Sequence, residues 1–167
     1  LASNLAPQDS NGVRDVFLRD RQTQTTTRVS VRSDGTQSTT AASEPAISAD
    51  GRYVAYVAGP PLAPSGHCIA VFDRTTGATT GGGVGSNCRQ PRIDATGETV
   101  VFLTGTSSVA TVVVRDRTTG TQTTLSPGGA SEPAITPDGR YVVFTSPDHP
   151  SITADDNDFD DVLLDDL

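Results

Sequence analysis

Two segments decide the fold of this chain: residues 43–58 read SEPAISADGRYVAYVA, and residues 131–146 read SEPAITPDGRYVVFTS. They start 88 positions apart and agree at ten of sixteen positions. A weaker version, CRQPRIDATGETVVFLT, occupies residues 88–104. The three versions share a proline and, six residues later, a glycine: Pro45 and Gly51, Pro91 and Gly97, Pro133 and Gly139. Self-similarity with a period of 42–46 residues is typical of tandem structural units that cannot bury their own faces alone.

A second repeated phrase lies between these segments, and together the two phrases predict four strands per unit. Strand a lies in EPAIS and is expected to begin at the proline, where the missing amide hydrogen costs no ladder bond. A turn at ADG or PDG leads to strand b, which is rich in β-branched and aromatic residues. Strand c ends at an RTTG turn, and strand d is rich in threonine. The second phrase begins at Val16, Ala70 and Val112.

Four-stranded antiparallel units of this length predict an all-β protein of the β-propeller class. Residues 1–42 would form a partial blade with strands c and d, 43–87 and 88–130 two complete blades, and 131–167 a partial blade with strands a, b and c. A propeller ring needs about four blades or more. Two interpretations remain: the chain is a slice of a longer propeller, or neighbouring copies complete one another's blades by strand exchange.

The phrases PAISADGRYVAYVA and PAITPDGRYVVFTS, with residues 1–31 (LASNLAPQDSNGVRDVFLRDRQTQTTTRVSV), are similar to the tryptophan–aspartate-like repeats of TolB-type β-propellers. The similarity covers essentially the whole chain. It implies a propeller fold and binding or scaffolding roles of the kind found in bacterial envelope and secreted proteins. The middle unit departs from the pattern, because DATGE replaces the DG turn.

The composition argues against a nucleic-acid partner. The 167 residues include 12 basic residues, all arginine, and 20 acidic residues, so the net charge is -8. Such a chain repels phosphate backbones and attracts divalent cations. The longest apolar runs are only strand-sized, and no membrane span is expected. The chain begins at Leu1 without a signal-peptide pattern, which favours a processed product or a piece of a longer chain.

Two acidic loops share the frame D-x-N-x-x-x-D followed by a strand-c pattern: residues 9–20 (DSNGVRDVFLRD) and 155–166 (DDNDFDDVLLDD). Oxygen ligands at alternating positions of a tight loop suit Ca²⁺, so the frames predict a calcium site in each loop. The alternative is a solvated acidic turn, where Asp and Asn are common for local reasons. The predicted ligands are Asp9, Asn11 and Asp15 in the first loop and Asp155, Asn157 and Asp161 in the second.

The two cysteines are predicted to form a disulfide. Cys68 lies in the expected b–c loop of one blade and Cys88 in the d–a loop that enters the next, and both loops emerge on the same propeller face. A Cys68–Cys88 disulfide would favour an extracytoplasmic location. The alternative is two free thiols in a cytosolic protein. A zinc site is disfavoured because only His67 lies beside these cysteines and no fourth ligand is evident.

The sequence contains no convincing catalytic motif. TGGGVGSN lacks the lysine of a phosphate-binding loop, no G-x-S-x-G elbow occurs, and His67 and His149 are isolated. An aspartate at the end of each strand c (Asp20, Asp73, Asp116, Asp166) is interpreted as structural.

We therefore expect a non-catalytic, calcium-binding propeller unit of an extracellular or cell-surface assembly, such as a tandem array, a fibre or an adhesive layer. Its partners would be copies of itself or adjoining propeller repeats, joined head to tail through blade edges. The alternative is a ligand- or protein-recognition propeller domain of a larger bacterial envelope protein or peptidase, with the periplasm as the alternative location.

Overall fold

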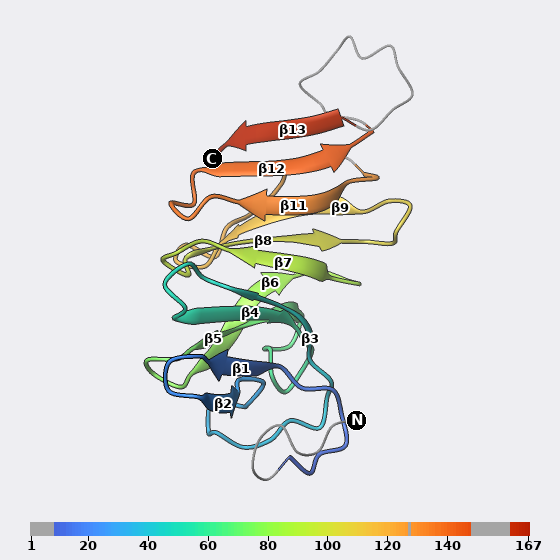
Figure 1. Ribbon diagram of the computed structural model, residues 1–167. Coiled ribbons are helices and arrows are strands. Elements are labelled where there is room, and N and C mark those ends of the chain that lie inside the picture. Colours follow the sequence, from blue (N-terminus) through green and yellow to red (C-terminus); the bar gives the residue numbers. More distant parts are fainter. Residues whose placement is uncertain (1–8, 127, 148–160) are drawn as a thin grey trace.

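The computed structural model describes residues 9–126, 128–147 and 161–167, which form thirteen strands and no helix. The strands make four antiparallel sheets that follow one another along the molecule, with β2 and β13 at opposite ends of the row (Figure 1). No helix suited to crossing a membrane occurs within these described ranges.

The sheets are numbered in chain order. Sheet 1 consists of β1 (Phe17–Asp20) and β2 (Thr25–Arg28). Sheet 2 consists of β3 (Ser43–Ile47), β4 (Tyr53–Val57), β5 (His67–Asp73) and β6 (Thr79–Val84). Sheet 3 consists of β7 (Arg89–Ile93), β8 (Thr99–Thr104), β9 (Thr111–Asp116) and β10 (Gln122–Thr124). Sheet 4 consists of β11 (Ser131–Ile135), β12 (Tyr141–Ser146) and β13 (Asp161–Asp166).

Within each sheet the strands pair in chain order, as expected for propeller blades. Sheets 2 and 3 are complete four-stranded blades, while sheet 1 contains only the c- and d-type strands and sheet 4 only the a-, b- and c-type strands among the described residues. The predicted fold class, an all-β propeller with two complete and two partial blades, is confirmed.

We expected the repeated proline at the start of strand a. The structure instead places it inside a bulge. The pairing register of β3, β7 and β11 with the next strand shifts around Pro45, Pro91 and Pro133. The residue before each proline has a positive φ, between 50° and 52°: Glu44, Gln90 and Glu132. Because proline has no amide hydrogen to donate, a bulge at the edge of a sheet accommodates it without losing a ladder bond.

The turn glycine is kept in the middle unit although the surrounding sequence differs. Gly97 has a φ of +73°, the same value as Gly51 in the preceding unit. It also packs against Tyr53 of sheet 2, and a Cβ atom at Gly97 would lie 2.5 Å from the ring. Glycine is required here both for the left-handed backbone and for the close approach of sheets 2 and 3.

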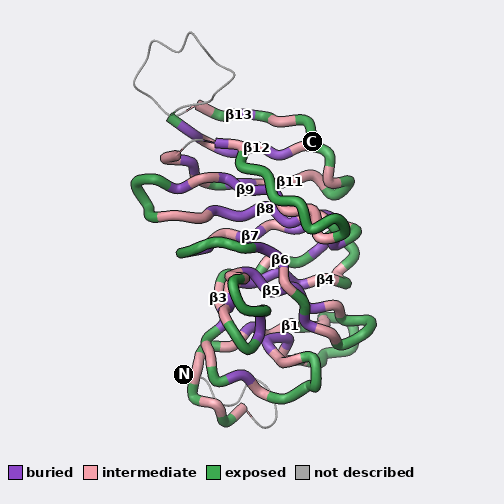
Figure 2. The backbone as a smooth tube through the Cα atoms, turned by 180° about the vertical axis from the view of Figure 1, so that it is seen from behind, coloured by how far each residue is buried: buried purple, intermediate pink, exposed green. Residues whose placement is uncertain are grey.

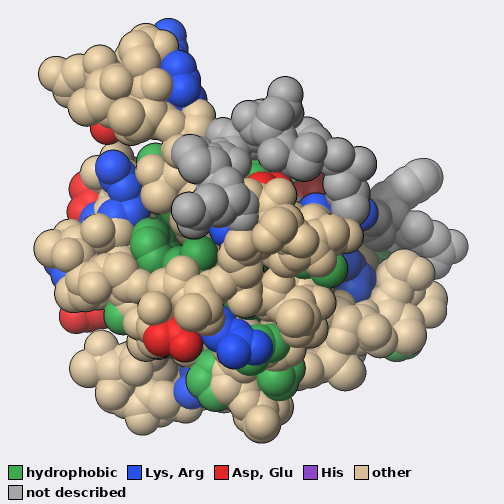
Figure 3. Space-filling model, turned by 90° about the horizontal axis from the view of Figure 1, so that it is seen from below, with side chains coloured by type: hydrophobic (Ala, Val, Ile, Leu, Met, Phe, Trp, Pro, Cys, Tyr) green, Lys and Arg blue, Asp and Glu red, His purple; other side chains and the backbone are tan. Residues whose placement is uncertain are grey.

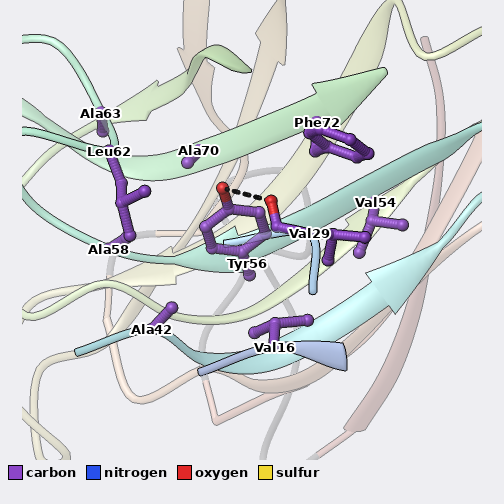
Figure 4. Close-up of a cluster of buried hydrophobic side chains, with 10 residues drawn as sticks. All are labelled: Val16, Val29, Ala42, Val54, Tyr56, Ala58, Leu62, Ala63, Ala70 and Phe72. Atoms are coloured by element: carbon purple, nitrogen blue, oxygen red, sulfur yellow. Dashed lines mark hydrogen bonds between the residues drawn. The ribbon is translucent and has the colours of Figure 1, made fainter. Parts of the chain in front are cut away.

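Three hydrophobic clusters fill the spaces between successive sheets. The buried residues concentrate in the strands of these sheets (Figure 2). One aromatic residue of each b-type strand is buried in a different cluster: Tyr56, Phe102 and Phe144. Tyr56 packs between sheets 1 and 2, where its hydroxyl donates a hydrogen bond to the Val29 carbonyl at 3.4 Å (Figure 4). Burial raises the pKa of Tyr56 to about 12, so the phenol stays neutral.

The glycine-rich stretch TGGGV, residues 80–84, belongs to β6 and does not form a ligand loop. A Cβ at Gly83 would lie 2.5 Å from the Phe102 ring of sheet 3, and a Cβ at Gly81 would lie 2.3 Å from the His67 ring. The glycines therefore allow neighbouring side chains to pack directly on the β6 backbone.

Candidate recognition site

In the first acidic loop an arginine lies between two of the predicted calcium ligands, Asp9 and Asp15, and the third, Asn11, contacts Asp15. Arg28 Nη1 lies 3.1 Å from Asp9 Oδ1 and 3.7 Å from Asp15 Oδ2. The Asp15 side chain is 1% exposed, so its negative charge is stable only with close partners. Arg28 supplies that partner, and sequence reasoning missed it because it lies 13 residues beyond Asp15, in β2.

Two neutral groups complete the environment of Asp15. The Ser30 hydroxyl donates to Asp15 Oδ1 at 2.6 Å, and Asn11 Nδ2 donates to Asp15 Oδ2 at 2.9 Å. Asn11 Nδ2 also donates to the Ser38 carbonyl. The structure thus shows a buried ion-pair network in which Arg28 provides the positive charge. Calcium binding by this loop stays a prediction and would require Arg28 to give up its place between the carboxylates.

In the second acidic loop, Asp155 and Asn157 lie outside the described residues. Asp161 is the first residue of β13, where it pairs with Ser146 of β12. Within the described part of the chain, no group of three or more His, Cys, Asp or Glu side chains is close enough together to hold a metal ion.

The predicted disulfide between Cys68 and Cys88 is present, with 5.8 Å between the two Cα atoms. Cys68 was expected in the b–c loop but is the second residue of β5, and Cys88 immediately precedes β7. The bond therefore joins the two complete sheets covalently.

The aspartates at the end of strand c hold turns and, in two sheets, bind an arginine. Arg52 donates two hydrogen bonds to Asp73, at 3.1 and 2.9 Å, and Arg140 donates two to Asp166, both at 2.9 Å. The hydrogen bonds from Arg52 lower the pKa of Asp73 from 3.8 to about 2. These contacts support the structural interpretation of the aspartates.

Sheet 3 lacks this pair because Glu98 occupies the position of Arg52 and Arg140. Asp116 still accepts hydrogen bonds from the Thr118 and Thr119 amides. Neither Glu98 nor Asp116 has an ion-pair partner among the described residues. The middle unit therefore carries two carboxylates where its neighbours carry a closed ion pair.

Glu98 borders a polar pocket of about 290 Å³ between sheets 2 and 3, together with Tyr53, Asp73 and Arg117. Arg117 donates to Thr80 Oγ1 of sheet 2 at 2.7 Å and to the Gly97 carbonyl of its own sheet, so it forms the wall of the pocket and links the two sheets. The pocket thus combines fixed walls with one exposed carboxylate, Glu98, that has no positive partner among the described residues. This is the best candidate for a ligand site.

His67 has no reactive group beside it among the described residues. His67 packs on Gly81, and its buried Nδ1 atom has no hydrogen-bond partner in the described part of the chain. Burial lowers the pKa of His67, and the nearby Arg115 lowers it further, which favours the neutral imidazole. His149 lies outside the described residues. The described residues give no direct evidence of catalysis.

The fold has clear relatives among solved structures. TolB from Acinetobacter baumannii is similar over 93% of this chain and 38% of its own, with 20% identity and a TM-score of 0.61. The tricorn protease is similar over 82% of this chain and 14% of its own, with 14% identity and a TM-score of 0.55. No protein-family model and no curated protein sequence matches the chain.

These identities establish the fold alone. The chain has a TolB-type β-propeller fold and spans 38% of the length of the TolB structure that it matches.

Proposed function

We propose that this chain is a recognition region of a β-propeller within a larger exported protein, and that it binds a partner without transforming it. The TolB-type fold and the partial coverage of both solved relatives support this function better than a self-assembling fibre. A propeller fold is compatible with many activities, so the proposal depends on the site.

The observation that carries the proposal is the break in the repeat at Glu98. In sheets 2 and 4 an arginine closes this position by binding the strand-c aspartate. In sheet 3 a carboxylate stands there instead, beside a pocket with walls already fixed by Arg117. A departure from a repeated structural pattern next to a pocket is where a functional site is expected.

The ligand is a basic side chain of a protein or peptide. Asp73 is neutralised by Arg52, so Glu98 is the carboxylate of this pocket with a charge available to a ligand. An incoming guanidinium would bind it with the fork geometry that Arg52 shows toward Asp73. The net charge of -8 attracts such a partner from a distance.

We place the protein in an oxidising compartment because of the Cys68–Cys88 bond. The periplasm and the cell surface are the locations consistent with both the disulfide and the proposed binding role.

Site-specific photocrosslinking in intact cells tests this function. A photocrosslinking amino acid at Thr118, an exposed residue that lines the pocket, is expected to capture a discrete partner in the full-length protein. The matched control carries the same group at Thr27, an exposed residue of β2.

The substitution Glu98→Arg restores the arginine of the other repeats and should abolish capture from Thr118 while the protein stays folded. The proposal would be contradicted if the control group at Thr27 captured the partner as well as the group at Thr118 does. It would also be contradicted if capture from Thr118 persisted in the Glu98→Arg protein.

A further inference from the structure

The edge of β1 that faces away from β2 differs from the same edge of every other described c-type strand. In sheets 2, 3 and 4 a b-type strand covers this edge: β4 pairs with β5, β8 with β9, and β12 with β13. Within the described residues, β1 pairs only with β2. An uncovered strand edge presents backbone donors and acceptors that another strand can satisfy.

The sequence of β1 matches a strand whose partner is known. Residues 15–20 read DVFLRD and residues 161–166 read DVLLDD, with identical residues at four of six positions. In sheet 4 the second of these segments pairs with β12, so that Tyr141 lies opposite Asp166 and Val143 opposite Leu164. A strand of the same type is therefore expected to pair with β1, with its tyrosine opposite Asp20 and its central residue opposite Leu18.

An apolar groove of about 240 Å³ lies beside this edge, between β1 and the strands β3 and β4. Ile47 lines it and is 55% exposed, whereas the equivalent Ile93 of sheet 3 is 8% exposed. Ile93 is covered by a cluster that includes the b-strand residues Tyr53, Ala55 and Val57 of the preceding sheet. The end of the molecule that carries sheet 1 shows hydrophobic surface between charged side chains (Figure 3). The residue that would cover Ile47 is thus a b-strand residue in sheet 1.

The charge at the end of β1 agrees with this arrangement. Asp20 has no ion-pair partner among the described residues. The equivalent Asp73 and Asp166 each bind the arginine that comes immediately before the b-type strand. An incoming strand with arginine at that position would complete the same pair on Asp20.

We propose that the β1 edge and the Ile47 groove bind a β-hairpin made of the a- and b-type strands of a further propeller repeat. The hairpin pairs antiparallel with β1, places its arginine on Asp20, and covers Ile47 with alternate side chains of its b-type strand. Together with β1 and β2 it forms a complete four-stranded blade.

The probe is a synthetic peptide with the sequence of residues 131–147, which contains the a- and b-type strands of sheet 4. Added to the ¹⁵N-labelled full chain, it is expected to shift the amide signals of β1 and of residues around Ile47, and to leave sheet 3 unchanged. A peptide with the same composition in scrambled order should cause no shifts.

Matched variants test the two contacts separately. Ile47→Asp in the chain should weaken binding at least about tenfold, whereas Val109→Asp, at an exposed valine far from the groove in sequence, should not. Replacing the peptide arginine by glutamate should weaken binding, and Asp20→Arg in the chain should recover part of it. Circular dichroism and thermal melting establish that each variant is folded.

Three results would overturn the proposal: no shifts at β1, shifts confined to β13 because the peptide displaces β12, or equal binding by the Val109 and Ile47 variants. If the chain self-associates and the peptide disrupts this association, a second copy of the chain occupies the groove. That result would overturn the assignment of the groove to a further repeat.

Discussion

Sheets 2 and 4 place the same repeat positions in opposite environments. Val71 lies in β5 opposite Ala55, and Leu164 lies in β13 opposite Val143, so the two residues are equivalent. Val71 is 1% exposed and Leu164 is 66% exposed. Both are apolar residues on similar strands. The difference arises because sheet 3 covers sheet 2, and no described sheet covers the outer face of sheet 4.

This comparison shows that the stability of the molecule lies between sheets more than within them. Strands pair within every sheet, but the side chains of a sheet become buried only when a neighbouring sheet packs against it.

The largest effect is expected from truncating a side chain between complete sheets. Phe102→Ala should lower the free energy of unfolding by about 3–5 kcal/mol, because it removes a fully buried ring that packs on Gly83. Leu164→Ala on the uncovered face should cost less than about 1 kcal/mol. Urea denaturation measures both, and similar losses would mean that the face of sheet 4 is covered in solution.

Removing the covalent link between the complete sheets should have the next largest effect. Cys68→Ser with Cys88→Ser opens a loop with a sequence separation of 20 residues, which should cost about 3 kcal/mol. Thermal melting of the wild type with and without reductant should give a similar difference. Intact mass after alkylation provides the control, because two alkylatable thiols in unreduced protein would exclude the disulfide and the oxidising compartment.

Calcium tests the two acidic loops, one in the described part and one outside it. If calcium binds the folded state, a free calcium concentration of about 100 times the dissociation constant should raise the free energy of unfolding by about 2.7 kcal/mol. The melting temperature should then fall with a chelator, and the calcium-dependent shift should shrink in the Asp155→Ala protein. A melting temperature that neither chelator nor added calcium changes would identify both loops as solvated turns.

The smallest effect should come from the charge pair that sheet 2 has and sheet 3 lacks. Asp73 has a lowered pKa, so its contribution to stability is complete above pH 3.8 and is lost as the pH falls toward about 2. The Arg52→Gln protein should lose this part of the pH dependence, with a change of only about 1–2 °C in melting temperature because the pair is near the surface. Glu98→Gln should leave the same acid profile unchanged, and an equal change in both variants would show that the pair is not its source.

Much of the fold could be predicted because strand patterns are local. The β-branched and aromatic run in RYVAYVA and the turn glycine before it lie within about ten positions of one another, and the repeat shows itself by recurring every 42–46 residues. The disulfide could be predicted because the order of strands in a blade places Cys68 and Cys88 at one end of adjacent sheets. The bulge at Pro45 could not, since the register shift depends on how β3 meets β4.

The candidate site at Glu98 was missed for a related reason. The DATGE departure was visible as an irregular turn, but its meaning depends on Arg52 and Arg140 binding aspartates 21 and 26 residues away. Once those pairs are known, Glu98 stands out as the exception.

The sequence by itself determined the repeat, the strands and their order in each sheet, because short apolar runs and the turns between them depend on residues close together along the chain. Only the tertiary structure decided the charge and burial of each site: Arg28 between Asp9 and Asp15, Arg117 beside Glu98, and the open groove at Ile47. The physical reason is that burial and ion pairing depend on which atoms come within a few ångströms, and in this protein those atoms belong to neighbouring strands and sheets.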